Sequence, residues 1–188
     1  MRLKGRRTIV TGAASGIGRA IAILFSSEGA KVVIADIDTD GGNSLVEEIL
    51  KSGGEALFVE TDVSCVGDVR TMIGRAHNFL TGIDILVNDA AAFVFGTVED
   101  VSSEYWEQVF GVNVLGSVNT VKESLPYLKA SEQPAIVNIA SVSSFIAQPA
   151  FVPYNTSKGA LLQLTRCLAM DLAPDGIRVN CVSPGSIY

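Results

Sequence analysis

The sequence predicts one α/β domain in which helices cover both faces of a doubly wound parallel sheet. Short, nearly continuous apolar runs rich in β-branched residues alternate with segments of helical pattern from end to end. Strands that are buried on both faces have this apolar character. Strand–helix alternation repeated five times requires right-handed crossovers, which place helices on both sides of a parallel sheet. No repeat, low-complexity tract or linker interrupts residues 1–188, so we expect a single domain.

Six strands and five helices follow from this pattern. We expect strands at 8–11, 31–37, 56–61, 84–88, 135–141 and 177–183. We expect helices at about 17–28, 40–52, 66–80, 103–129 and 155–173. The segments 103–129 and 159–172 are apolar around more of their circumference than one core-facing stripe requires. Their outer faces lie either deep in the core or in a subunit interface, and the pattern leaves both alternatives open.

Composition and charge narrow the class of protein. Fourteen Lys and Arg residues against twenty Asp and Glu residues leave a net charge of −6, which argues against a nucleic-acid or anionic-membrane partner. The N-terminal apolar run is too short for a signal peptide or a membrane span. Three cysteines and one histidine lack metal-ligand spacing, and free thiols suit a reducing compartment. We therefore expect a cytoplasmic protein without a metal site.

The first predicted strand runs into a glycine-rich turn that opens a helix. Gly12 permits a tight turn, Gly16 lets the backbone approach a pyrophosphate, and Gly18 lets the helix pack on the strand. The helix start presents free N–H groups to phosphate oxygens. Asp36 ends the second strand, where a carboxylate accepts hydrogen bonds from ribose hydroxyls and repels a 2′-phosphate. These residues predict a dinucleotide site with a preference for NAD over NADP.

A second group of polar residues lies near the end of the fifth predicted strand. Ser141 follows an apolar run, Tyr154 comes thirteen residues later, and Lys158 is four residues beyond it. Tyr154 and Lys158 share one helix face, where an ammonium group lowers a phenol pKa by roughly 1–3 pH units. Tyr154 could then exchange a proton with an alcohol, while the Ser141 hydroxyl holds the substrate oxygen and Lys158 reaches the nicotinamide ribose.

These motifs together resemble the short-chain dehydrogenase/reductase family. The run from Thr11 to Gly18 resembles its TGxxxGxG fingerprint, and Ser141, Tyr154 and Lys158 resemble its Ser-x12-Tyr-x3-Lys arrangement. The resemblance implies a Rossmann-like fold and NAD(H)-dependent hydride transfer between a secondary alcohol and a ketone, with Tyr154 as acid and base. It also implies that Asn113 is a fourth catalytic residue, which holds a water molecule linked to Lys158.

The resemblance extends the expected cofactor site. It implies that Asp62 and Val63 contact adenine, that the Pro184–Gly185 turn lies below the nicotinamide, and that Ile187 contacts the carboxamide. The complete set of residues expected at the cofactor is Gly12, Ser15, Gly16, Ile17, Gly18, Asp36, Asp62, Val63, Asn88, Ala90, Tyr154, Lys158, Pro184, Gly185 and Ile187. The family also implies a homo-oligomer, a dimer or tetramer, paired through the long helix and the Tyr154 helix.

Two features depart from the family pattern. The chain has Asn88-Asp89-Ala90-Ala91 where the family usually has Asn-Asn-Ala-Gly. Asp89 adds a negative charge and Ala91 adds a Cβ atom, so we expect weakened cofactor binding. The chain also stops at Tyr188, where family members usually continue with a substrate-covering loop, helices and a seventh strand. We therefore expect a C-terminally truncated family member.

Other functions remain compatible with the motifs. A catalytically silent dinucleotide-binding or interaction scaffold would explain the short C-terminus, although the set of Asn113, Ser141, Tyr154 and Lys158 is intact. An epimerase or dehydratase acting on sugar nucleotides uses the same Tyr–Lys pair, but such relatives typically have a different glycine spacing. The identity of the small-molecule substrate is open, and the apolar residues at 93–96 and 145–151 hint at an apolar compound.

Overall fold

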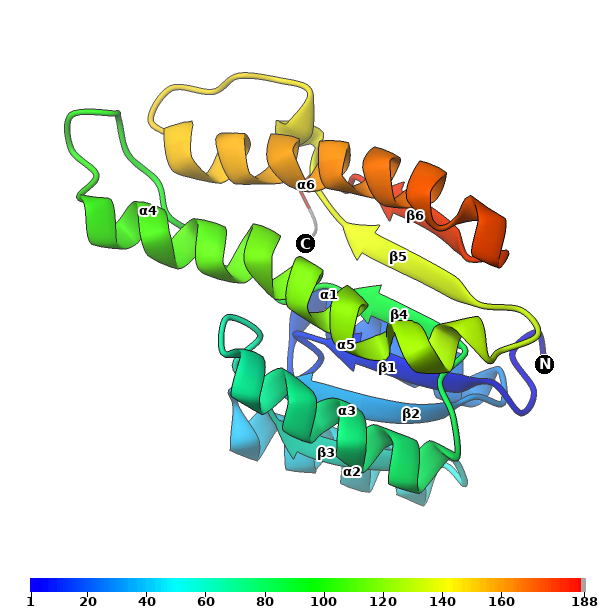
Figure 1. The fold of residues 1–188 in the computed structure, drawn as a ribbon. Helices are drawn as coiled ribbons and strands as arrows, with labels where there is room; N and C mark the ends of the chain where they lie inside the picture. Colours follow the sequence, from blue (N-terminus) through cyan, green and yellow to red (C-terminus); the bar gives the residue numbers. More distant parts are fainter. Residues whose placement is uncertain (187–188) are drawn as a thin grey trace.

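Within residues 1–186, which the computed structural model describes, six parallel strands form one sheet in the order β3-β2-β1-β4-β5-β6 (Figure 1). The strands are β1 (Arg7–Thr11), β2 (Lys31–Asp36), β3 (Glu55–Glu60), β4 (Ile85–Asn88), β5 (Ala135–Ile139) and β6 (Arg178–Val182). The α-helices are α1 (Gly16–Ser27), α2 (Thr39–Lys51), α3 (Val66–Leu80), α4 (Ser103–Phe110), α5 (Ser117–Lys129) and α6 (Val152–Asp171). The predicted doubly wound, Rossmann-like α/β fold is confirmed.

Two apolar clusters hold the helices to the two faces of the sheet. On one face, α3 and α5 pack fully buried side chains such as Met72 and Leu128 against Ile9 and Leu86. On the other face, α1 and α2 pack against β1 and β2, where Leu45 is fully buried. Helices on both faces explain why the inner strands read as continuous apolar runs, because neither face of these strands meets water.

The sheet grows in two directions from its centre. β1 pairs with β2 on one side and with β4 on the other, so the chain reverses its direction of growth between β3 and β4. Thr11 at the end of β1 lies opposite both Ala35 and Asn88. The carboxyl ends of the strands therefore lie on one side of the sheet, the side to which the arrowheads point in Figure 1. We call this side the carboxyl edge. Ligands of open α/β sheets bind at such a reversal point.

The long helix predicted at 103–129 is interrupted by a wider turn. Between α4 and α5 the chain forms a π-helical segment, η1 (Gly111–Gly116), which places Asn113 in the protein interior. α6 begins at Val152, three residues earlier than expected, because Pro153 fits the first helical turn, where its missing N–H has no partner to lose. None of the helices within residues 1–186 combines the length and hydropathy that a membrane-spanning segment needs.

The opposite side of the sheet, at the amino ends of its strands, carries a partly buried ion pair between Arg7 and Asp84. The Asp84 carboxylate accepts hydrogen bonds from the backbone and guanidinium of Arg7 and from the Ser131 hydroxyl. Burial raises the pKa of Asp84, but the hydrogen bonds from Arg7 and Ser131 outweigh it and lower the pKa to about 2. This contact ties β1 to β4 and to the segment after α5, away from the carboxyl edge.

Candidate active site

The glycine turn between β1 and α1 forms one wall of the site. Gly12 has φ +66°, and a Cβ atom there would lie 2.7 Å from the backbone of Ala90. A Cβ atom at Gly18 would lie 2.3 Å from the Gly12 carbonyl oxygen, so both positions require glycine. At Gly16 (φ +54°) a Cβ atom would meet only open space beside the cavity. The Ser15 side chain makes no capping hydrogen bond, which leaves N–H groups at the start of α1 for a ligand.

Asp36 stands at the end of β2, directly beside this turn. One of its carboxylate oxygens accepts a hydrogen bond from the Ala14 N–H (2.9 Å), and the other accepts one from the Asp38 N–H (3.0 Å). These bonds fix the carboxylate at the edge of the cavity. Asp62 follows the neighbouring strand β3 at the same end of the cavity, and its carboxylate accepts hydrogen bonds from the backbone N–H and hydroxyl of Ser64.

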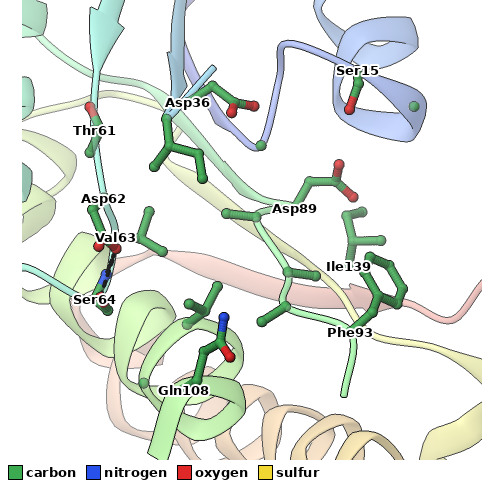
Figure 2. A pocket seen from close by; sticks show the side chains of 18 of the residues that line it. Ser15, Asp36, Thr61, Asp62, Val63, Ser64, Asp89, Phe93, Gln108 and Ile139 are labelled. Atoms are coloured by element: carbon green, nitrogen blue, oxygen red, sulfur yellow. Dashed lines mark hydrogen bonds between the residues drawn. The ribbon is translucent and has the colours of Figure 1, made fainter. Parts of the chain in front are cut away.

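A single cavity of about 670 Å³ connects these residues to the Tyr154 helix. In Figure 2, Asp36, Asp62 and Val63 surround one end, Asp89 lies near the middle, and Ile139 and Phe93 lie at the other end. The lining also includes Tyr154 and Lys158. The volume falls within the range of about 300–1,000 Å³ that is usual for small-molecule and cofactor sites.

The segment after β4 forms the floor of the cavity. The Thr11 hydroxyl accepts hydrogen bonds from the N–H groups of Asp89 and Ala90 (3.2 and 3.3 Å), which ties this segment to the glycine turn. Burial raises the pKa of Asp89 to about 6, although the charge of Lys158 and the Gly18 N–H oppose this rise. The Asp89 carboxyl therefore exchanges its proton near neutral pH.

Ser141 and Tyr154 meet at the carboxyl edge. Ser141 follows β5 in an extended conformation and begins the short 3-10 helix η2 (Val142–Ser144), whose Ser143 N–H donates to the Ser141 hydroxyl oxygen. Burial raises the pKa of Tyr154, and a hydrogen bond between Tyr154 and Ser141 partly opposes this rise. Tyr154 lines the cavity, whereas Ser141 follows Ala140, the last residue of this segment that lines it.

Lys158 is almost completely buried, with 3% of its surface exposed. Its ammonium donates a hydrogen bond to the Ile139 carbonyl oxygen (2.8 Å) and lies 5.8 Å from the centroid of the Tyr154 ring. Burial lowers the pKa of Lys158 to about 8, although the Asp89 charge opposes this. We expected Lys158 to lower the pKa of Tyr154. In this structure the Lys158 ammonium is turned to the Ile139 carbonyl oxygen rather than to the phenol oxygen that it was expected to stabilise. Burial therefore dominates and the pKa of Tyr154 is raised.

Asn113 connects three parts of the site. Its side-chain oxygen accepts a hydrogen bond from the Ala92 N–H, and its side-chain nitrogen donates to the Ala92 carbonyl and to the Ser157 hydroxyl. The η1 turn is thereby tied to the cavity floor and to α6, one turn from Tyr154. The expected link from Asn113 to Lys158 through a water molecule stays a prediction.

Sequence reasoning missed a buried chain of polar side chains under the site. The Thr120 hydroxyl donates to Asn88, Asn88 donates to Asn138, and Asn138 donates to Thr165. The chain joins α5, β4, β5 and α6, and all four side chains are buried. Asn138 within an apolar strand was the available signal, since a buried amide needs hydrogen-bond partners on neighbouring elements.

The cavity brings together most of the predicted cofactor residues. Those that line it are Gly12, Ser15, Gly16, Ile17, Asp36, Asp62, Val63, Ala90, Tyr154 and Lys158. Asn88 points into the polar chain instead, and Gly18 packs behind the turn. Pro184 accepts a hydrogen bond from the Val142 N–H, which places the Pro184–Gly185 turn beside Ser141. Ile187 lies outside the described residues. Within residues 1–186 no cluster of three or more His, Cys, Asp or Glu side chains could hold a metal ion.

An aromatic wall flanks Tyr154 at the open end of the cavity. The Phe93 ring stacks on the Tyr154 ring at 5.2 Å, and the Phe95 ring lies 4.5 Å from Phe151. The Gly96 N–H donates to the Ala150 carbonyl (2.6 Å), which holds the two segments together. Phe93 and Phe95 remain 65% and 51% exposed, so apolar surface faces the approach to Tyr154.

Comparison with known proteins assigns this fold and site to one family. The family model described as short chain dehydrogenase matches residues 6–188. The chain therefore belongs to the short-chain dehydrogenase family, a family of oxidoreductases, as the resemblance in the sequence predicted.

Individual relatives agree with this membership. A Thermotoga maritima protein named as an uncharacterized oxidoreductase is 39% identical over 99% of this chain and 73% of its own length. An L-fucose dehydrogenase of Oryctolagus cuniculus is 36% identical over the whole chain and 64% of its own length. The crystal structure of a short-chain dehydrogenase/reductase from Burkholderia phymatum in complex with NAD has a TM-score of 0.96 at 33% identity, covering 100% of this chain and 68% of that one.

Proposed function

We propose that the protein is an NAD(H)-dependent oxidoreductase that interconverts a secondary alcohol and a ketone, with Tyr154 as acid and base. The main support for this proposal is that the glycine turn and Asp36 line one end of a cavity whose other end is lined by Tyr154 and Lys158. A dinucleotide site is thereby continuous with a proton donor and a cation, the arrangement that hydride transfer to a carbonyl requires.

The residues present fit NAD. Gly16 opens directly onto the cavity, and the uncapped start of α1 offers N–H groups to phosphates. The fixed Asp36 carboxylate would accept hydrogen bonds from the adenosine ribose and repel a 2′-phosphate. The Burkholderia phymatum relative was crystallised with NAD, which supports the same cofactor here.

The ionisation of Tyr154 suits ketone reduction. Its raised pKa keeps the phenol protonated at neutral pH, so Tyr154 can give its proton to the ketone oxygen as negative charge develops there. The Ser141 hydroxyl donates a second hydrogen bond to the same oxygen. The nicotinamide, when bound, supplies the hydride. In the reverse direction Tyr154 accepts the alcohol proton as a phenolate.

The substrate of this reaction carries an apolar group. Phe93 and Phe95 present exposed ring surface beside Tyr154, and apolar area removed from water is worth about 25 cal/mol per Å². A ketone with an apolar substituent would bury this wall when its oxygen reaches Tyr154. Turnover of a small polar ketone with no gain for an apolar analogue would contradict this assignment while leaving the oxidoreductase proposal intact.

Replacing Tyr154 with Phe tests the proposal. We expect the Tyr154→Phe variant to bind NADH like the wild type but to lose at least about 100-fold in turnover across a panel of alcohols and ketones, because proton transfer contributes about this much. Tyr105→Phe is the matched control, since the Tyr105 side chain is 57% exposed and outside the cavity. Full turnover by Tyr154→Phe would remove Tyr154 from its proposed role.

The alternatives are less well supported. A silent scaffold is not favoured, because Tyr154 and Lys158 line the cavity together with the glycine turn, and relatives are named oxidoreductase and L-fucose dehydrogenase. An epimerase or dehydratase finds no specific support in this geometry. Cofactor binding without turnover of any alcohol or ketone would reinstate the scaffold.

We infer that the protein forms a homo-oligomer, a dimer or tetramer, through α4, α5 and α6. The outer faces of α4, of η1 between α4 and α5, and of α6 keep large apolar side chains in contact with water, with Tyr105 57%, Leu115 55% and Met170 79% exposed. An interface with a second copy would remove this surface from water. Sedimentation of the purified protein at micromolar concentration should give a dimer or tetramer mass, and a monomer mass would contradict the inference.

A further inference from the structure

Asp89 places a carboxylate in the middle of the cofactor cavity. Its Oδ2 atom lies against Gly18, where an added Cβ atom would be only 2.8 Å away. In Figure 2 the side chain points between Ser15 of the glycine turn and Ile139. The Asp89 N–H donates a hydrogen bond to the Thr11 hydroxyl (3.2 Å), which ties the backbone of Asp89 to the glycine turn.

Charged and polar groups from β2, α6 and α1 face Asp89. Asp36 approaches from β2 and adds repulsion, while Lys158 approaches from α6 and attracts the carboxylate. Tyr154, also on α6, senses the Asp89 charge, which raises the pKa of the phenol. The start of α1 supplies the Gly18 N–H. Burial is the largest influence and leaves Asp89 with a pKa of about 6.

This position conflicts with the phosphates of a dinucleotide. The N–H groups at the start of α1 are the donors that a pyrophosphate needs, and the Asp89 carboxylate lies against this helix start at Gly18, inside the same cavity. Two anions in a partly dehydrated site repel strongly. A proton on Asp89 removes this repulsion.

We propose that Asp89 takes up a proton when the dinucleotide cofactor binds, and that it thereby sets the cofactor affinity of the site. This rests on the proposed function. The bound anion favours the protonated carboxyl, so the complex holds more protons than the free protein. Affinity for NADH is therefore highest below about pH 6 and falls by up to about tenfold per pH unit above it, until the carboxyl of the complex itself ionises.

Calorimetric titration of the full chain with NADH measures the proton directly. Titrations near pH 7.5 in two buffers that differ in ionisation heat should show uptake approaching about one proton per NADH bound. Asp89→Asn keeps the size and hydrogen-bond capacity of the side chain but has no proton to gain. It should lose this uptake and bind NADH at least about tenfold more tightly at this pH. Glu99→Gln removes an exposed charge from the same segment and should behave like the wild type.

The outcomes separate this inference from the function on which it rests. Equal proton uptake by the wild type and Asp89→Asn would assign the proton to another group, Lys158 first, and would overturn the role of Asp89 with NADH binding intact. NADH binding that is independent of pH would do the same. If the wild type, Asp89→Asn and Glu99→Gln were all folded and none bound NADH, the proposed function would be overturned, and this inference with it.

Discussion

Lys158 is required by the proposed reaction, but burying its charge lowers the stability of the fold. Its ammonium is buried and donates a hydrogen bond to the Ile139 carbonyl oxygen. The spacing of Tyr154 and Lys158 predicted that both would share a helix face, and α6 confirms it. The pattern could not predict that burial raises the pKa of Tyr154 and lowers that of Lys158, because burial depends on strands and loops from other parts of the chain.

Replacing Lys158 with Met should stabilise the protein while abolishing its chemistry. Each pH unit of pKa displacement corresponds to about 1.4 kcal/mol, and the Ile139 carbonyl loses its donor at a cost of about 1–2 kcal/mol. We expect the free energy of unfolding near pH 7 to rise by about 1–3 kcal/mol, measured by urea denaturation. Lys122→Met, at an exposed position, should change it by less than about 0.5 kcal/mol.

The pH dependence of this effect has a defined sign. The unfolded chain binds the Lys158 proton more tightly than the folded protein, whose Lys158 pKa is about 8. Between about pH 8 and 10.4 the unfolded state therefore holds more protons, and Lys158 makes stability rise with pH. Lys158→Met should lack this contribution. If Lys158→Met were markedly less stable than the wild type, the buried ammonium would not destabilise the fold, contrary to this prediction.

At the scale of elements, the helices that carry the site depend on close packing. The sequence predicted the glycine turn and α1, because the roles of Gly12, Gly16 and Gly18 follow from their spacing. It did not predict the η1 interruption, since apolar periodicity cannot distinguish a π-helical turn within a long helix. The reason for η1 lies in tertiary contacts, where Asn113 reaches Ala92 and Ser157.

Replacing Gly18 with Ala tests the packing of α1. The added Cβ atom would collide with the Gly12 carbonyl oxygen and with the Asp89 carboxylate. We expect the turn to shift, NADH affinity to fall at least about tenfold, and stability to drop by about 1–3 kcal/mol. Gly74→Ala in α3 is the matched control, because nothing lies within 4 Å of its Cβ position. This control should gain up to about 1 kcal/mol from helix propensity. Unchanged NADH binding by Gly18→Ala would refute the close contact.

On the scale of the whole molecule, the candidate site and the main polar contact lie at opposite ends of the strands. The cavity, the glycine turn and Tyr154 lie at the carboxyl ends, whereas the Arg7–Asp84–Ser131 cluster lies at the amino ends. The alternation of apolar runs predicted the fold class. It also predicted where each strand begins and ends to within one or two residues. The Arg7–Asp84 pair had no such signal, because the two residues are 77 positions apart and only the pairing of β1 with β4 brings them together.

Replacing Asp84 with Asn should destabilise the fold without affecting cofactor binding. The pKa of Asp84 is lowered to about 2, so its contribution is present above about pH 4 and is lost as pH falls toward 2. Near pH 7 we expect a loss of about 2 kcal/mol in urea denaturation, shrinking in acid. Asp171→Asn, at an exposed position, is the control. Equal stability of Asp84→Asn and wild type near pH 7 would contradict the role of this pair.

The most direct test of the dinucleotide site is parallel titration of the 188-residue chain with NADH and with NADPH, followed by cofactor fluorescence. We expect saturable NADH binding, NADPH binding weaker by at least about tenfold because Asp36 repels the 2′-phosphate, and a reduced difference in Asp36→Ala. Absence of saturable binding to either cofactor by the folded protein would contradict the dinucleotide site. Equal affinity for both cofactors would contradict Asp36 as its selector.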